Sequence, residues 1–244
     1  MARILFASDL HLSTARPATV DRFLRFIAEE AARADALYVL GDLFEYWIGD
    51  DELSAPDGDP LARQVADAFR ALTRGGVALY FMQGNRDFLV GKAFIDACGA
   101  SLLADPSVRE VGGIATLLMH GDTLCTDDHE YMAWRTTTRS EAWQRELLAA
   151  PLALRRERAQ ALRAQSEASK KDKAAEIMDV NAEAVREAFE RYGVTRMIHG
   201  HTHRPAHHLL TVAGRSCERW VLPDWYGRGG YLLVEDGAPR LVYF

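Results

Sequence analysis

Short apolar runs alternate with longer amphipathic stretches along the first 82 residues. The runs at residues 4–7, 37–40 and 77–82 predict buried strands, because each is short and almost wholly apolar. The stretches between them, after Pro17 and over residues 61–72, place apolar side chains at helical spacing and predict helices. This strand–helix alternation predicts a mainly parallel sheet with helices on its faces.

The pattern changes after a fourth predicted strand at residues 115–119. Residues 129–192 contain no Gly, a single Pro and many Ala, Glu, Arg and Leu, which predicts two to four helices. We interpret this stretch as a helical insertion in one domain that spans residues 1–244. Strand character then returns in short segments at residues 194–198, 217–222, 231–235 and 241–244.

Composition narrows the class of protein. Hydrophobic residues make up 48% and charged residues 26% of the 244 residues, as in an ordinary soluble domain. The net charge of −6 argues against a nucleic-acid partner, and no apolar stretch reaches the ~18 residues of a membrane-spanning helix. The three cysteines are far apart, so no disulfide framework is expected, and polar residues interrupt the first apolar run, so no signal peptide is expected. A cytoplasmic location fits these features best.

Five of the predicted strands are followed directly by side chains that can bind metals. In open α/β sheets, ligands bind at the carboxyl ends of the strands. We therefore expect the polar residues after five predicted strands to converge on one edge of the fold. In chain order they are Asp9, His11, Asp42, Asn85, His120, His201 and His203.

Taken singly, most of these residues have a plain structural interpretation. Asp9 could be a turn residue, Asp42 a helix cap, Asn85 a left-handed turn residue and His120 a satisfied core histidine. The pair in Gly-His-Thr-His is more specific, because residues two apart project to the same side of an extended segment. Chance does not readily place all of them at strand ends, so jointly they predict a site.

The side-chain types indicate which metals would bind. Imidazole nitrogens with carboxylate or amide oxygens, and no thiolate, suit Mn²⁺, Fe²⁺ or Zn²⁺. Seven side chains exceed the ligands that one ion needs, whereas two ions that share a carboxylate would use them all. Paired ions about 3.5–4 Å apart hydrolyse phosphate esters and anhydrides.

The motif series D-x-H, G-D, G-N-[HR]-[DE], H-G-D and G-H-x-H resembles the calcineurin-like metallophosphoesterases over residues 9–203. The resemblance implies an αββα sandwich and two Mn²⁺ per chain, with a helical insertion acting as a lid. It also implies that Asp42 bridges the ions. The ligands of one ion would be Asp9, His11, Asp42 and His203, and those of the other Asp42, Asn85, His120 and His201.

One motif departs from the superfamily pattern. Where most members have a histidine after Gly-Asn, this chain has Arg86. Arginine does not donate a proton at neutral pH, but its guanidinium binds phosphate through two parallel hydrogen bonds. The substitution favours a leaving group that needs no proton, such as a phosphate released from a diphosphate.

Longer segments extend the resemblance, at residues 8–12, 41–51, 84–88, 177–181 and 199–205. They resemble one branch of that superfamily, the UDP-2,3-diacylglucosamine diphosphatases of the lipid A pathway. The resemblance implies hydrolysis of UDP-2,3-diacylglucosamine to UMP and 2,3-diacylglucosamine 1-phosphate (lipid X), through attack of an ion-held hydroxide on the α-phosphorus. It assigns catalytic roles to Asn85, Arg86 and His201.

The same resemblance implies a set of substrate contacts. Family members often carry Asn where this chain has Lys170. The implied contacts are Asn85, Arg86, Asp128, Ser166, Lys170, Lys173 and His201.

The predicted insertion is rich in both apolar and basic residues. Between residues 133 and 173, ten Lys and Arg face five acidic residues. A solvated helical face is the plain interpretation of most of these charges. The functional interpretation is a lid that shelters two acyl chains and meets an anionic membrane. We therefore expect a cytoplasmic monomer, peripheral to the inner membrane, with no nucleic-acid partner.

Two alternatives stay open. Another phosphodiesterase or nucleotide pyrophosphatase of the superfamily would fit the metal motifs. Such an enzyme would be expected to have histidine at position 86 and no apolar insertion, whereas this chain has Arg86 and the insertion. A binding scaffold on the same fold would fit the architecture, but scaffolds tend to lose metal ligands, and all seven are present.

Overall fold

The first of two sheets combines strands from both ends of the chain. The computed structural model describes residues 2–172 and 179–244, and only the backbone of residues 165–172. The strands of this sheet are β1 (Arg3–Ala7), β2 (Ala36–Leu40), β3 (Ala78–Met82), β4 (Ser101–Leu103), β10 (Gly230–Glu235) and β11 (Ala238–Tyr243). They lie in the order β11-β10-β1-β2-β3-β4, and β1 to β4 are parallel.

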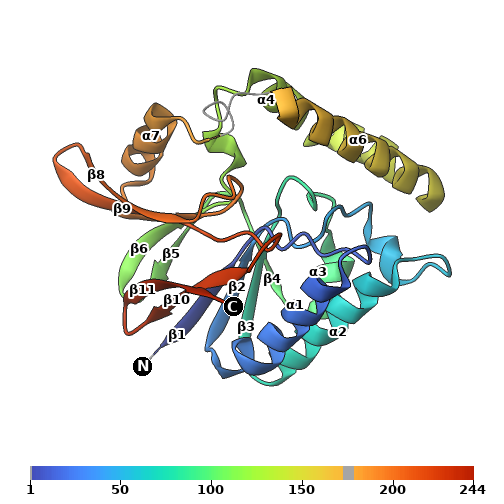
Figure 1. The fold of residues 1–244 in the computed structure, drawn as a ribbon, viewed down its shortest axis with the longest axis horizontal. Helices are drawn as coiled ribbons and strands as arrows, with labels where there is room; N and C mark the ends of the chain where they lie inside the picture. Colours follow the sequence, from blue (N-terminus) through green and yellow to red (C-terminus); the bar gives the residue numbers. More distant parts are fainter. Residues whose placement is uncertain (1, 173–178) are drawn as a thin grey trace.

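A second sheet packs against the first (Figure 1). Its strands are β5 (Ser107–Val111), β6 (Ile114–Leu118), β7 (Arg196–His199), β8 (Ala206–Val212) and β9 (Arg215–Val221). They lie in the order β5-β6-β7-β9-β8, with β6, β7 and β9 parallel. The alternation at the start of the chain predicted a mainly parallel sheet, and β1, β2 and β3 are adjacent and parallel in the first sheet, which confirms it. Helices do not cover both of its faces, because the second sheet packs against one of them.

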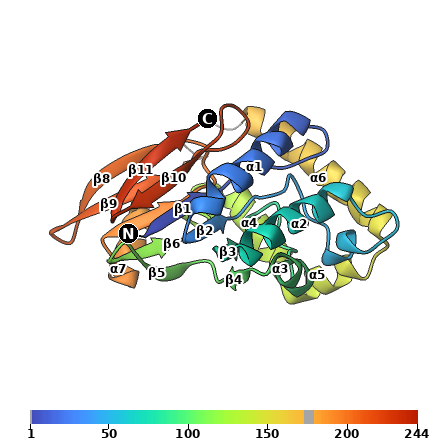
Figure 2. The same cartoon turned by 90° about the horizontal axis from the view of Figure 1, so that it is seen from below.

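Helices cover the outer face of each sheet, which gives four layers (Figures 1 and 2). The first sheet is covered by α1 (Pro17–Glu29), α2 (Pro60–Arg74) and α3 (Lys92–Cys98), whose apolar side chains form one core with it. The second sheet is covered by α7 (Ala182–Tyr192), which buries Val185 and Phe189. A third apolar cluster lies between the sheets. The αββα sandwich is therefore confirmed.

Local sequence explains where these helices begin and end. Both α1 and α2 have proline in their first turn, where its missing N–H costs nothing. The Asp59 carboxylate caps α2 by accepting the Leu61 N–H at 2.9 Å. The shorter 3-10 helices are η1 (Ala31–Arg33), η2 (Asp50–Leu53) and η3 (Asp122–Leu124).

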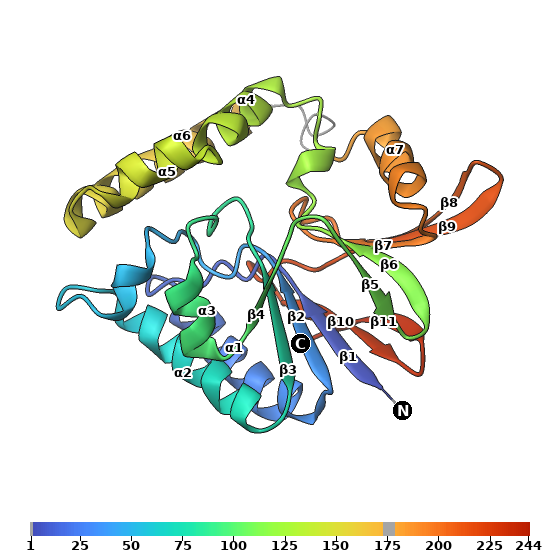
Figure 3. The same ribbon diagram turned by 180° about the vertical axis from the view of Figure 1, so that it is seen from behind.

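Three helices form a separate group above the open edge of the sandwich (Figure 3). They are α4 (His129–Thr138), α5 (Glu141–Leu148) and α6 (Leu152–Asp172), and we call them the roof helices. The range 129–192 taken from the sequence thus contains these helices and also α7, which packs on the second sheet. Within the described chain, no helix is both long and apolar enough to cross a membrane.

The chain leaves the sandwich for the roof helices and returns at nearly the same point. The backbone N–H of Asn181 donates to the Leu124 carbonyl at 2.8 Å, and the Asn181 amide donates to Asp127 at 3.0 Å. The Asn181 side chain also caps α7. The two stems of the excursion are therefore joined directly to each other.

Candidate active site

The polar residues that follow five strands do meet at one edge of the sandwich. Strands β1, β2 and β3 of the first sheet and β6 and β7 of the second end there. The seven candidate ligands from the sequence lie together, and we call them the floor of the site: Asp9, His11, Asp42, Asn85, His120, His201 and His203. Among the His, Cys, Asp and Glu residues that the structure describes, two sets have ligand atoms that all lie within 4.8 Å of one another. The first set is Asp9–His11–His203 and the second is Asp9–Asp42–His120.

The first set centres on Asp9. Its Oδ1 atom lies 3.3 Å from His203 Nε2 and 3.9 Å from His11 Nε2. The two imidazoles face each other at 3.2 Å between their Nε2 atoms. His11 Nε2 also lies 3.8 Å from Asp42 Oδ2, which links this set to the next.

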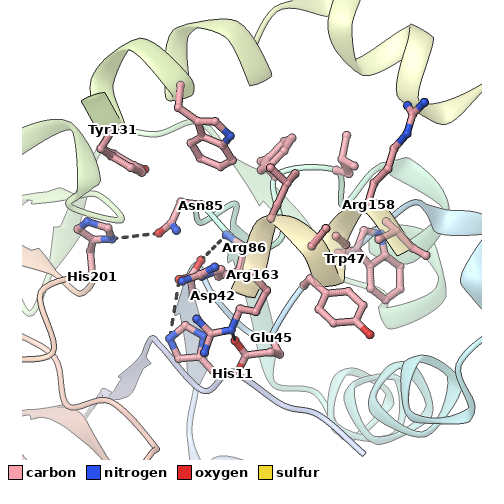
Figure 4. Close-up of a pocket in the computed structure, with 18 of the residues that line it drawn as sticks. His11, Asp42, Glu45, Trp47, Asn85, Arg86, Tyr131, Arg158, Arg163 and His201 are labelled. Atoms are coloured by element: carbon pink, nitrogen blue, oxygen red, sulfur yellow. Dashed lines mark hydrogen bonds and ion pairs between the residues drawn. The ribbon is translucent and has the colours of Figure 1, made fainter. Parts of the chain in front are cut away.

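Asn85 joins His201 to the second set, Asp9–Asp42–His120 (Figure 4). Its Oδ1 atom lies 2.9 Å from His120 Nε2 and 3.0 Å from His201 Nδ1. Asp42 Oδ1 lies 3.7 Å from His120 Nε2, so the two oxygens of Asp42 face different sets. Asp42 therefore lies between the two sets of candidate ligands.

Unpaired buried atoms test whether these residues fit a cation. Within the described chain, the carboxylate oxygen Asp9 Oδ1 is buried and has no hydrogen-bond partner. The Nδ1 atom of His120 donates to the Leu40 carbonyl at 2.9 Å, which leaves its Nε2 lone pair directed at the floor. Buried acceptors without donors are costly unless a cation is bound. The donor set therefore fits divalent metals.

The backbone of the floor is strained. Five of its residues have φ between 48° and 69°, in the left-handed region that non-glycine residues avoid. They make up five of the seven such residues in the part of the chain that the structure describes: Asp9, His11, Asp42, His201 and His203. Such conformations cost about 1–3 kcal/mol each and cluster at functional sites.

Two glycines let the backbone approach the carboxylates closely. A Cβ atom on Gly84 would lie 2.2 Å from Asp42 Oδ1, and one on Gly200 would lie 2.2 Å from Asp9 Oδ2. Neither position can accept a side chain without moving a candidate ligand. This explains physically why Gly precedes Asn85 and His201 in the motifs.

The charges of the floor are strongly coupled. Burial raises the pKa of Asp42 to about 7, and the nearby Asp87 and Asp9 carboxylates add to this effect. Burial lowers the pKa of His120, but the carboxylates of Asp42 and Asp122 outweigh it and raise the pKa to about 9. Carboxylates this close together bind positive charge readily, whether as protons or as a metal ion.

A buried carboxylate below the floor orders the loops that carry it. Asp87 accepts backbone N–H groups from Gly84, Asp42 and Leu43 at 2.7, 3.2 and 2.7 Å. These bonds join the loop after β2 to the loop after β3. Sequence reasoning assigned no role to Asp87, although the acidic position in G-N-[HR]-[DE] was a signal for it.

Family comparison adds to this geometry. Residues 2–205 match the family model described as calcineurin-like phosphoesterase. The chain belongs to this family.

Curated relatives of this phosphoesterase match over nearly its whole length. A UDP-2,3-diacylglucosamine hydrolase of Aromatoleum aromaticum is 48% identical over 98% of this chain and 95% of the relative. Proteins of the same name from Chromohalobacter salexigens and Klebsiella pneumoniae are 50% and 48% identical, over 96% and 98% of this chain and 94% and 98% of their own. The similarity therefore includes the roof helices as well as the metal motifs.

A cavity of about 860 Å³ extends from the floor of the phosphoesterase to the underside of the roof helices. Its far part has aromatic and aliphatic walls (Figure 4). These walls include Trp47, Phe88, Trp134, Trp143, Leu147 and Leu162. The candidate metal ligands thus open into a chamber with apolar walls.

Charged side chains fix the roof helices to the sandwich. Arg155 of α6 is 3% exposed and donates to the Ile48 carbonyl at 2.6 Å and to Asp51 at 2.9 Å. Arg139 donates to the Gly84 carbonyl at 2.8 Å and lies 4.9 Å from the centre of the Phe88 ring. The roof is therefore held in place over the cavity.

A further pair of contacts joins the roof to the H-G-D motif. Asp122 accepts the Tyr131 hydroxyl at 2.6 Å and Arg135 Nε at 2.8 Å. Burial alone would raise the pKa of Asp122, but His120, His201 and Arg135 outweigh it and lower the pKa. The carboxylate therefore stays charged between α4 and the floor.

The structure gives the side-chain positions of four of the seven residues predicted to contact substrate. Asn85, Arg86, Asp128 and His201 line the cavity. Lys173 lies outside the described residues, and Ser166 and Lys170 lie in the part of α6 that the structure describes by its backbone alone. Other lining residues had not been singled out from the sequence: Glu45, Tyr46, Glu130, Tyr131 and Arg204.

Proposed function

We propose that this phosphoesterase hydrolyses the diphosphate bond of UDP-2,3-diacylglucosamine to UMP and 2,3-diacylglucosamine 1-phosphate, a step of lipid A biosynthesis. One observation carries the proposal: a floor with two sets of candidate metal ligands opens into a cavity of about 860 Å³ with apolar walls. A substrate that joins a diphosphate to two acyl chains matches both parts. The name of the relatives with 48–50% identity supports the same substrate.

We infer that two divalent ions, as Mn²⁺, occupy the floor, because its imidazole, carboxylate and amide donors suit that metal. When bound, such ions activate water and neutralise phosphoryl oxygens. Asp42 would be a ligand shared by both ions. The first set would be completed by Asp9, His11 and His203, and the second by Asn85, His120 and His201.

Side chains beside the floor would hold the diphosphate. The Arg86 backbone N–H donates to Asp42 Oδ1 at 2.8 Å, which fixes the start of its side chain at the edge of the floor. Its guanidinium would bind phosphoryl oxygens as a charged clamp. Burial, with His120 beside it, lowers the pKa of His201 to about 3, so this imidazole stays neutral. Asn85, Arg86 and His201 would together stabilise charge at the α-phosphorus.

The leaving group needs no acid in this arrangement. Attack at the α-phosphorus releases a sugar phosphate, which leaves as an anion without accepting a proton. Arg86 stands where most members of the superfamily have histidine, and its guanidinium can stabilise that anion without protonating it.

The rest of the substrate would lie under the roof. Asp128, Ser166, Lys170 and Lys173 would contact the glucosamine and its phosphate, as family resemblance implies. The apolar walls would take the acyl chains. Basic residues of the roof helices would meet the anionic inner membrane from the cytoplasm, and the enzyme would act as a peripheral monomer.

A direct test measures UMP release from UDP-2,3-diacylglucosamine by chelator-treated protein with and without Mn²⁺. We expect release only with Mn²⁺, and in ¹⁸O-labelled water we expect the label in UMP. Label in the sugar phosphate would contradict attack at the α-phosphorus. Hydrolysis of bis(p-nitrophenyl) phosphate without any UMP release would retain the metal floor but reject this substrate.

A further inference from the structure

The loop between β9 and β10 covers one side of the floor. Its Trp225 is fully buried, donates its backbone N–H to the Asp9 carbonyl at 3.0 Å and donates its indole N–H to the Gly230 carbonyl at 3.0 Å. The indole also packs edge-on against Phe26 and Phe244. The loop is therefore anchored beside Asp9, although it lies beyond residues 2–205, which match the family model.

The next residue of this loop, Tyr226, contacts a candidate ligand. Its ring stacks on the His11 imidazole, with centroids 4.7 Å apart and planes 22° apart. It also lies 5.4 Å from the His203 ring. The Arg16 guanidinium lies 4.4 Å from the centre of the Tyr226 ring and donates to the His11 carbonyl. Ring and backbone of His11 are thus held by neighbouring groups.

The Tyr226 hydroxyl reaches the roof helices. Arg163 of α6 donates to it at 3.2 Å, and the hydroxyl lies 3.4 Å from Glu45 Oε2. Glu45 in turn pairs with Arg163 at 2.5 Å and with Arg16. The hydroxyl therefore belongs to a charged cluster at the cavity wall, whereas the ring contacts the His11 imidazole.

Two histidines of the floor differ in how their rings are oriented. A metal-binding imidazole is usually fixed by a hydrogen bond from its second nitrogen. His120 has this bond, from Nδ1 to the Leu40 carbonyl. His11 Nδ1 is buried and lacks a hydrogen-bond partner in the described structure. Another contact must fix the His11 ring, and the Tyr226 stack is in the right place.

We propose that Tyr226 is a positioning residue for metal binding: its ring orients His11 by stacking, in place of the hydrogen bond that orients His120. The proposal rests on the proposed function only in taking His11 as a metal ligand. Removing a partner that orients a ligand weakens metal binding by about 10- to 100-fold. The aromatic ring, rather than the hydroxyl, should carry this effect.

The test is a Mn²⁺ titration of chelator-stripped protein without substrate, followed by the electron paramagnetic resonance signal of free Mn²⁺. Tyr226→Ala should weaken binding of one ion by about 10- to 100-fold. Tyr226→Phe keeps the ring and should bind both ions within about twofold of the unmodified protein. Tyr226→Leu keeps apolar bulk without a ring, so it should also weaken binding of one ion. It replaces Tyr226→Ala in the test if Tyr226→Ala does not fold.

Tyr243→Ala is the matched control, because Tyr243 has a similar exposure, 41% against 43%, and lies on β11. It should leave Mn²⁺ binding unchanged. Unchanged binding in both Tyr226→Ala and Tyr226→Leu would overturn the proposal, and so would a Tyr226→Phe variant as weak as Tyr226→Ala. A Tyr226→Ala variant with normal Mn²⁺ affinity but raised KM would place the ring against substrate instead.

The outcome is separable from that of the proposed function. If the unmodified protein releases no UMP but Tyr226→Ala still weakens Mn²⁺ binding, the substrate is wrong and the positioning role stands. If the unmodified protein binds no Mn²⁺, both proposals fail.

Discussion

The floor and the roof of the cavity are held in place by different means. The carboxylates and imidazoles of the floor are set by backbone, because they follow strand ends and are fixed by left-handed conformations and by the N–H groups that Asp87 accepts. Asp9, Asp42 and His120 are at most 2% exposed. The roof is a helical excursion with partly exposed side chains, held by a few arginines.

This difference separates chemistry from substrate recognition. A change in the floor alters groups that the whole sandwich positions, so it should abolish turnover. A change in the roof alters a surface that is attached at few points, so it should alter substrate affinity and leave the reaction itself intact. Three experiments test this separation, in order of decreasing effect.

The largest effect is expected in the floor. Asp42→Asn keeps the shape of the side chain but removes the negative charge that faces both sets of donors. We expect kcat for UMP release to fall by more than about 100-fold, because that is the upper range for residues that only orient metal ligands. Mn²⁺ titration should show weaker binding of both ions, and circular dichroism should show an unchanged fold. A variant with kcat within tenfold of normal would contradict the shared position of Asp42.

A smaller effect is expected in the roof. Arg155→Ala removes the buried contacts of α6 with Asp51 and the Ile48 carbonyl. We expect KM for the acylated substrate to rise about tenfold, equivalent to about 1.4 kcal/mol, which is within the range for leaving a buried polar group unpaired.

Two controls accompany this variant. Hydrolysis of bis(p-nitrophenyl) phosphate, which is too small to need the roof, should be unchanged. Arg145→Ala on α5 is the matched variant, because Arg145 is exposed. Equal loss of both activities in Arg155→Ala would show that the floor depends on the roof.

The smallest effect is expected from a change on β9, away from both the floor and the roof. Glu218 on β9 binds Arg196, Trp220 and His207, at 2.5, 3.0 and 3.1 Å. Burial raises its pKa, but the hydrogen bond from Arg196 and its other partners lower it below the usual 4.5. Because the folded pKa is the lower one, the ionised carboxylate stabilises the fold above pH 4.5, and this contribution is lost as the pH falls through the folded pKa.

Glu218→Gln should therefore cost less than about 1 kcal/mol of unfolding free energy at pH 7, as for a partly exposed ion pair. The difference should disappear as the pH falls below 4.5, and kcat should not change. Denaturant unfolding at a series of pH values measures this. A difference that grows toward acid pH would refute the direction of the pKa shift.

Much of the floor was predictable from sequence because its residues directly follow short apolar strands. Asp42 after residues 37–40 and His120 after residues 115–119 illustrate this, since the strand and its polar end are adjacent in the chain. The division into two sheets was not predictable from the pattern. Central strands buried on both faces look alike whichever sheet they join.

The remaining differences arise from long-range packing. Strand β8 was not predicted, since it is an edge strand in which Leu209 is 74% exposed. No Gly or Pro separates helix α7 from the roof helices in the sequence, and helical spacing does not tell which surface a helix covers. Asp87 and Tyr226 act on residues 45 and 215 positions away, so their roles appear only once the chain is folded.

The joined stems at Leu124 and Asn181 bear on how such an enzyme can diverge. Because the excursion starts and ends at one hydrogen-bonded point, a doubling of its length would change the loop-closure free energy by only about 0.6 kcal/mol. Insertions and deletions within it would leave the register of both sheets intact. The roof can therefore vary as a module, and descendants of one hydrolytic sandwich could acquire new specificities by exchanging a single peripheral segment.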